Sequence, residues 1–104
     1  MAKPITIKVN DDSGDIIYGV SVLNAKGGDE ITWTCENGPF TLDFKTPSPF
    51  EEGEFQLQSR PARLHTAKAK VRKDAPKGRY YYGVAVSSKD KIYTDHGCPE
   101  LIIR

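Results

Sequence analysis

The stretch GDEITWTCENGPFTLDF, residues 28–44, carries two runs of alternating apolar and polar side chains on either side of a turn sequence. The apolar members fall at every second position: Ile31, Trp33 and Cys35 in the first run, then Phe40, Leu42 and Phe44 in the second. Because successive side chains of a strand point to opposite faces, this period of two predicts strands with one buried face. The Glu-Asn-Gly-Pro sequence between the runs is typical of a turn. We therefore predict a strand, a tight turn and a second strand, with Trp33 as an anchor of the core.

The same alternation extends over most of the 104 residues, and no window of helical length carries a helical apolar stripe. The other predicted strands cover residues 5–9, 16–23, 67–72, 79–86, 92–94 and 99–104. Gly19 is a candidate bulge or close-approach point inside its strand. We interpret the proline-interrupted residues 46–66 as a long crossover with a helical turn near residues 50–54, and residues 87–91 as a hydrophilic loop. About eight short strands separated by turns predict an all-β, Greek-key β-sandwich of about 7–8 strands in one domain, residues 1–104.

Three consecutive tyrosines lie in the predicted strand at residues 79–86. A period of two sends Tyr80 and Tyr82 into the core and leaves Tyr81 exposed. Tyr80 follows Gly78 closely, like the residue of a tyrosine corner, whose hydroxyl bonds the backbone a few residues upstream. The triplet is therefore mainly structural, and only Tyr81 is available to a partner.

Charge is distributed unevenly along a chain whose formal net charge is only +1. Residues 1–58 carry 4 basic and 10 acidic side chains, whereas residues 59–104 carry 11 basic and 4 acidic ones. The candidate interaction surface consists of Lys68, Lys70, Arg72, Lys73 and Tyr81. The predicted strand that carries these cations is either an ordinary solvated edge of the sheet or the contact surface for an unidentified protein partner, which would be acidic. The near-neutral net charge and the lack of a recognisable stacking motif argue against nucleic acid.

Membrane proteins and several enzyme classes are not indicated by the sequence. No apolar run approaches the roughly 20 residues that a membrane span needs, and the first four residues lack the apolar core of an export signal. We expect a soluble chain, cytoplasmic as written or exported with its signal trimmed. The motifs GxSxG and HExxH and a phosphate-binding glycine loop do not occur, so we expect neither an enzyme nor a cofactor.

The segments GDEITWTCENGPFTLDF, AKAKVRKDAPKGRYYYGV and PELIIR together resemble the strands and turns of cupredoxins, the small sandwiches of blue copper proteins. In that family the copper ligands are a histidine after the third-strand turn, and a cysteine, a second histidine and usually a methionine from the loop joining the last two strands. Matching PFTLDF and GRYYYGV to the family patterns places Phe40 at the first histidine, Val84 at the cysteine and Ser87 near the second histidine. The only methionine is Met1. Since blue copper requires a thiolate and two imidazoles, the resemblance implies a cupredoxin-like domain that lacks these ligands, with Phe40 filling their site.

The two cysteines leave a different kind of metal site open. Cys35 and Cys98 have no CxxC spacing, which argues against a zinc ribbon or a thioredoxin-like pair. Two thiolates with His96, and His65 as a fourth ligand, would suit zinc or copper(I) if the loop around Cys98 approaches Cys35. A Cys35–Cys98 disulfide in an oxidising compartment is a second alternative, and two unlinked thiols are the default.

We therefore expect a metal-free cupredoxin-like binding or assembly module. The alternative is a small zinc or copper(I) carrier that uses Cys35, His96 and Cys98. The sequence pattern does not predict a particular partner, a biological process or an oligomeric state.

Overall fold

Two facing β-sheets make up the chain in its computed structural model, which describes residues 2–10, 12–44, 49–50, 56–60, 64–95 and 99–104. The first sheet has the order β2-β1-β4-β7 and contains β1 (Ala2–Asn10), β2 (Asp15–Tyr18), β4 (Glu30–Cys35) and β7 (His65–Lys70). The second has the order β3-β10-β8-β5-β6, with β9 also paired to β8, and contains β3 (Val22–Ala25), β5 (Phe40–Phe44), β6 (Gln56–Gln58), β8 (Gly78–Ser88), β9 (Lys91–Asp95) and β10 (Glu100–Ile103). No helix occurs among the described residues, which confirms the predicted all-β sandwich. That part of the chain accordingly contains no helix able to cross a membrane.

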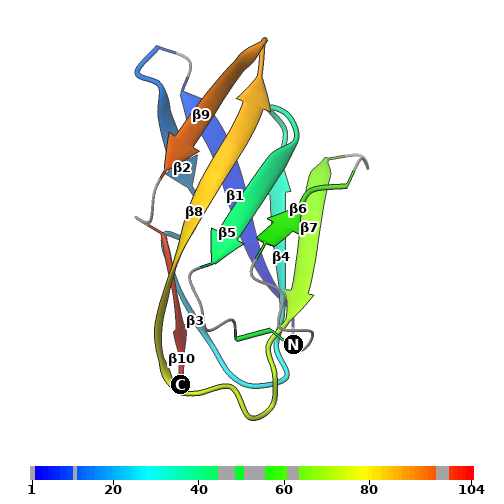
Figure 1. The fold of residues 1–104 in the computed structure, drawn as a ribbon, viewed down its shortest axis with the longest axis vertical. Helices are drawn as coiled ribbons and strands as arrows, with labels where there is room; N and C mark the ends of the chain where they lie inside the picture. The colour runs from blue at the N-terminus through cyan, green and yellow to red at the C-terminus, as the bar shows by residue number, and fades with distance from the viewer. Residues whose placement is uncertain (1, 11, 45–48, 51–55, 61–63, 96–98) are drawn as a thin grey trace.

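The long strand β8 organises the second sheet (Figure 1). Its first residues, Gly78–Tyr81, pair with β10, and its last residues, Val84–Ser88, pair with β9 on the same side. β5 pairs antiparallel along the other side. Figure 1 shows β8 and β5 in front of β1 and β4, so the inner faces of the two sheets meet between these strands.

The strand predicted at residues 16–23 is divided between the two sheets. β2 pairs with β1 in the first sheet, whereas β3 pairs with β10 in the second. Between them Gly19 donates its backbone N–H to the carbonyl of Thr6 at 2.8 Å, and the chain then crosses from one layer to the other. The inward-facing positions change parity at this crossing, from even residue numbers in β2 to odd ones in β3. Gly19 is therefore a crossing point that lies against the backbone of Thr6, as the close-approach alternative predicts, whereas the prediction of a bulge inside one strand is wrong.

The segment predicted as an irregular crossover contains strand pairing. β6 pairs with β5, and Phe50 forms an isolated bridge with Val71. The apolar side chains of Phe50 and Leu57 are buried, so each anchors its part of the crossover to the core. Residues 51–54 of the predicted helical turn lie outside the described residues.

The hydrophilic loop predicted at residues 87–91 is instead a tight β-hairpin. β8 extends to Ser88, which pairs with Lys91 at the start of β9. Lys89 and Asp90 have positive φ angles of 50° and 62°, which is the conformation of a two-residue type I′ turn. With the divided strand and β6, the described part of the chain holds ten strands instead of the predicted 7–8.

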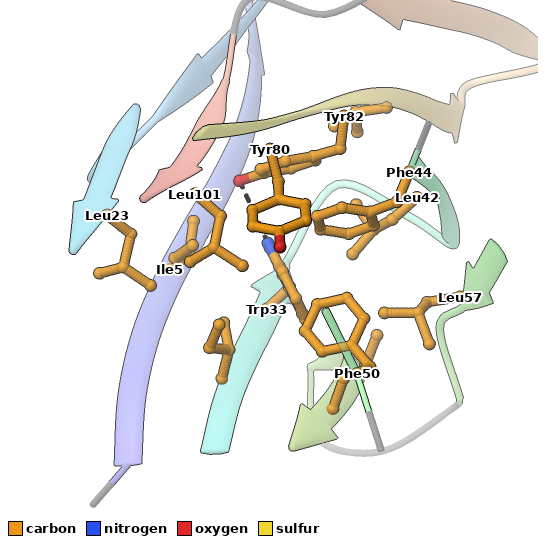
Figure 2. Close-up of a cluster of buried hydrophobic side chains, with 14 of the residues drawn as sticks. Ile5, Leu23, Trp33, Leu42, Phe44, Phe50, Leu57, Tyr80, Tyr82 and Leu101 are labelled. Carbon is orange, nitrogen blue, oxygen red and sulfur yellow. Dashed lines mark hydrogen bonds between the residues drawn. The ribbon is translucent and has the colours of Figure 1, made fainter. Parts of the chain in front are cut away.

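Trp33 lies in the core, as predicted, and anchors a cluster of aromatic rings (Figure 2). Its indole Nε1 donates to the hydroxyl of Tyr82 at 3.3 Å. The rings of Phe44 and Phe50 each pack edge-on to it with centroids 6.1 Å away, and Phe44 stacks on Tyr82 at 4.6 Å. Such pairs contribute about 0.5–1.5 kcal/mol each beyond the area they bury. The cluster joins the first sheet, through Trp33, to the second sheet, through Phe44 and Tyr82.

The three tyrosines are arranged as the alternation predicts. Tyr80 and Tyr82 are buried, whereas Tyr81 is 48% exposed. The hydroxyl of Tyr80 donates to the carbonyl of Pro76 at 2.6 Å, which confirms the predicted tyrosine-corner bond.

Candidate functional site

One pole of the sandwich, where β5 begins and β8 turns into β9, contains the positions that the cupredoxin resemblance assigned to copper ligands. Phe40 pairs with Val86 and Leu42 pairs with Val84, so Phe40 and Val84 are diagonal neighbours on the inner face of the second sheet. Each of these two side chains is 3% exposed. Ser87 is exposed on the outer face of β8. Two hydrocarbon side chains in the core and one solvent-facing hydroxyl thus stand at the ligand positions.

A close backbone approach holds this pole together. The N–H of Ser87 donates to the carbonyl of Pro39 at 2.9 Å, and a Cβ added at Gly38 would collide with the carbonyl oxygen of Ser87. The hydroxyl of Ser59 accepts a hydrogen bond from the N–H of Phe40 at 2.8 Å. The turn between β4 and β5 therefore rests directly on the end of β8, with no room for a side chain at Gly38.

A shallow hollow of about 270 Å³ opens on this pole. Its polar lining comes from Thr41, Gln58, Ser59 and Ser87, and its rim includes Ile92, which is 74% exposed. None of the described residues that line it is a histidine, cysteine or methionine. Within the described ranges, no three His, Cys, Asp or Glu side chains come together as a metal site would require. Because copper in a blue site needs thiolate and imidazole, the residues described at this pole do not fit one.

Cys35 and His65, two of the predicted zinc or copper(I) ligands, lie directly opposite each other on β4 and β7. Directly opposed residues of an antiparallel pair have Cβ atoms about 4.5–5.5 Å apart. Cys35 is buried and, in the part of the chain that the structure describes, is a free thiol, whereas His65 is half-buried at the start of β7. His96 and Cys98 lie outside the described residues. The structure therefore brings together half of the predicted set.

The predicted basic surface is divided between the two layers. Lys68 and Lys70 project from the outer face of β7 in the first sheet, and Lys73 is exposed shortly after that strand. Arg72 is half-buried, and its Nε has no hydrogen-bond partner among the described residues. Tyr81 projects from the outer face of the second sheet, so the structure does not bring it to these cations.

The hydroxyls of Tyr18 and Tyr82 serve the structure of the sandwich. The hydroxyl of Tyr18 on β2 donates to the carboxylate of Asp95 on β9 at 3.0 Å and so joins an edge of each sheet. Burial raises the pKa of Tyr82 to about 12; the charge of Asp95 acts in the same direction, and the hydrogen bond from Trp33 opposes it. Tyr82 is therefore protonated at neutral pH and acts as a hydrogen-bonding member of the core.

Sequence reasoning missed Glu100 on β10. This residue lies opposite Val22 of β3 on one side and Tyr81 of β8 on the other. Its Oε2 is buried, with no hydrogen-bond partner among the described residues. The alternation in PELIIR could have indicated an outward-facing Glu100, since it places Glu100 and Ile102 on one face and the buried Leu101 on the other.

The fold is similar to that of amicyanin, a cupredoxin. An oxidized point mutant of amicyanin superposes with a TM-score of 0.55 at 15% sequence identity, covering 97% of this chain and 82% of that chain. A Cu(I) form of another amicyanin point mutant gives a TM-score of 0.51 at 16% identity with the same coverage. No family profile and no curated protein matches the sequence. The chain therefore has a cupredoxin-like fold, and at this identity the similarity establishes the fold alone.

Proposed function

We propose that this chain is a binding or assembly module built on a cupredoxin-like sandwich that carries no blue-copper site. The observation that supports this most strongly is the burial of Phe40 and Val84 at two ligand positions of the resemblance. A phenyl ring and an isopropyl group offer copper no donor atom, and the nearby hydroxyl of Ser87 is a poor substitute for imidazole. Core side chains fill the interior of this pole, so we propose that the module acts through contacts of its surface with other molecules.

A partner of acidic character is supported by the outer face of β7. Lys70 lies opposite Glu30 on β4, whereas Lys68 lies opposite the uncharged Thr32. Lys68 is therefore the less compensated of the two cations and the better contact for a carboxylate. Co-purification from the native host tests this role: Lys68→Glu is expected to lose the partner, and Lys3→Glu, a change on another strand, is expected to retain it. Equal recovery of the partner by both variants would count against β7 as the contact surface. We propose no catalytic role for the module alone.

Copper loading of the purified full chain tests the absence of a blue site. Addition of one equivalent of Cu(II) is expected to give no intense visible band and to leave no copper bound after desalting. A strong thiolate-to-copper charge-transfer band at one copper per chain would overturn the proposal. The Cys35→Ser variant serves as a control, because loss of such a band in it would identify the thiolate.

A small metal carrier is the second candidate function, favoured by the direct opposition of Cys35 and His65. It requires His96 and Cys98 to complete the ligand set. Competition with a chromophoric chelator for Zn(II) or Cu(I) distinguishes the two functions. Tight stoichiometric binding that weakens in both Cys35→Ser and His65→Ala supports a carrier, whereas no competition in the wild-type chain supports the binding module.

A further inference from the structure

The outer face of the second sheet carries an exposed apolar patch with a carboxylate at its centre. Val22 on β3, Glu100 on β10 and Tyr81 on β8 lie directly opposite one another in a single row across three neighbouring strands. Val22 is 43% exposed, Tyr81 is 48% exposed, and Glu100 between them is half-buried. Ile102 lies in the next row on the same face. Figure 1 shows the three strands side by side, with β10 between β3 and β8.

One oxygen of the Glu100 carboxylate is not satisfied by its described neighbours. Its Oε2 is buried and lacks a hydrogen-bond partner within the described part of the chain. Arg104 is engaged elsewhere, because its Nε donates to the side chain of Asn24 at 2.8 Å. Arg79 lies opposite Ile102, one row away, and makes no bond to this oxygen. A carboxylate with a buried, unpaired oxygen is costly, so a cation that another molecule brings to the exposed part of this half-buried side chain would offset part of that cost.

A second carboxylate lies close to the same tyrosine. Asp43 is exposed on the outer face of β5 opposite Gly83, two positions along β8 from Tyr81. Diagonal neighbours of this kind are within reach of long side chains. Tyr81 therefore stands between Glu100 and Asp43, and the face of an aromatic ring also attracts cations.

From these observations we propose that this face binds a protein segment that presents a lysine or arginine beside an apolar side chain. The cation bonds Glu100 over the ring of Tyr81, and the apolar neighbour covers Val22 and Ile102. This inference rests on the proposed binding function and names its second surface and the chemistry of the partner. The molecule then has two binding faces of different character, a cationic one on β7 and an acidic and apolar one on β10 and β8.

An NMR titration of the full ¹⁵N-labelled chain tests the proposal with two synthetic peptides. The first is acetyl-Ala-Val-Lys-Val-Ala-amide, and the second has norleucine in place of lysine. Saturable shifts are expected at residues 22–24, 79–82 and 100–103 with the lysine peptide alone. Glu100→Gln is expected to weaken the apparent Kd on the order of tenfold or more, the usual effect of removing a hydrogen bond to a charged group. Tyr81→Ala is expected to weaken binding, and Tyr81→Phe, which keeps the ring, to preserve it.

A stability measurement separates recognition from a purely structural role. If Glu100 serves a partner and destabilises the free chain, Glu100→Gln raises the urea midpoint of the free chain while it weakens peptide binding. A lower midpoint together with unchanged binding would assign Glu100 to the fold and overturn the inference.

Other results also overturn it. Equal binding of the two peptides, or shifts confined to β7, would remove the case for a cation at this face. Concentration-dependent shifts at the same residues without peptide would assign the face to a second copy of the chain. The copper test is independent of these results, so a failure of the titration and a failure of the proposed function are distinguishable.

Discussion

Truncation of Phe40 to alanine tests whether its ring is part of the core or merely covers the position that the cupredoxin resemblance assigns to a copper ligand. Burial of a large apolar side chain is worth about 1.5–3 kcal/mol, and a sealed cavity costs roughly a further 24 cal/mol per Å³. Phe40 is buried on the inner face of β5, and none of the aromatic pairs found among the described residues includes its ring. Its truncation loses buried area and leaves a cavity, but no aromatic pair is lost with it. We therefore expect Phe40→Ala to lower the free energy of unfolding by about 3 kcal/mol, the lower end of the range for such changes.

The matched control is Phe44→Ala on the same strand. Unlike Phe40, Phe44 stacks on Tyr82 and packs edge-on to Trp33 and Phe50. Its truncation loses aromatic pairs as well as buried area and leaves a closed cavity. We expect a cost of about 4–5 kcal/mol, larger than that of Phe40→Ala.

Urea denaturation followed by the fluorescence of Trp33, the only tryptophan, measures both changes. The midpoint and the slope m are compared, because a changed slope would report an altered denatured state. Domains of this kind have stabilities of about 5–15 kcal/mol, so costs of this size are large enough to measure. A cost below about 1 kcal/mol for Phe40→Ala would refute the view that the core extends to this pole. A cost above that of Phe44→Ala would contradict the expected ranking of the two positions.

Three further changes test the structure at separate places. The pKa of Tyr82 is about 12 in the folded chain, against 10 for an ordinary tyrosine. The stability that the protonated hydroxyl contributes is therefore fully present below pH 10 and is lost as pH rises from 10 to 12. The loss amounts to about 3 kcal/mol at most, and urea midpoints across that pH range measure it; a flat profile would contradict the burial of the hydroxyl. Tyr18→Phe removes the bond to Asp95 between β2 and β9 and is expected to cost about 1 kcal/mol by the same assay, with no cost if the edges are held otherwise. Gly38→Ala drives a Cβ against the carbonyl of Ser87 and is expected to cost about 1–3 kcal/mol, whereas an unchanged midpoint would show that the turn moves freely off β8.

The buried positions were predictable because alternation with a period of two directly encodes burial on a strand. Trp33 and Tyr82 lie inward as expected, and the hydroxyl of Tyr80 makes its expected bond to Pro76. The crossing at Gly19 was not predicted, because the run IIYGVSVL is rich in strand-forming residues on both sides of it. The available signal was that the inward-facing apolar residues change from even to odd numbers across Gly19.

The hairpin between β8 and β9 was missed for a different reason. Lys89 and Asp90 both adopt positive φ, but the pair lacks the Asn-Gly or Asp-Gly sequence that usually announces a type I′ turn. The pairing of β8 with β9 therefore has to impose a conformation that these two residues do not favour on their own. A local sequence pattern cannot reveal a turn that is stabilised mainly by the strands beside it.

The candidate surfaces depend on strand register, which is a long-range property of the fold. Tyr81 appeared to belong with Lys68 and Lys70 because they are neighbours in sequence, but β7 and β8 lie in different sheets. The strands that place Glu100 between Val22 and Tyr81 come from distant parts of the chain.

Strand pairing also changes what the charge distribution means. The acidic half and the basic half of the chain suggest a strong dipole, yet β4 from the first half pairs with β7 from the second, so Glu30 faces Lys70 directly. In the basic half, Glu100 is separated from the lysines of β7 because it lies in the other sheet. At this pair the opposite charges of the two halves are brought together when the sheet forms. Attraction of a partner then depends on where charged groups gather on the folded surface, such as Lys68 on one face and Glu100 on the other, and not on their separation along the sequence.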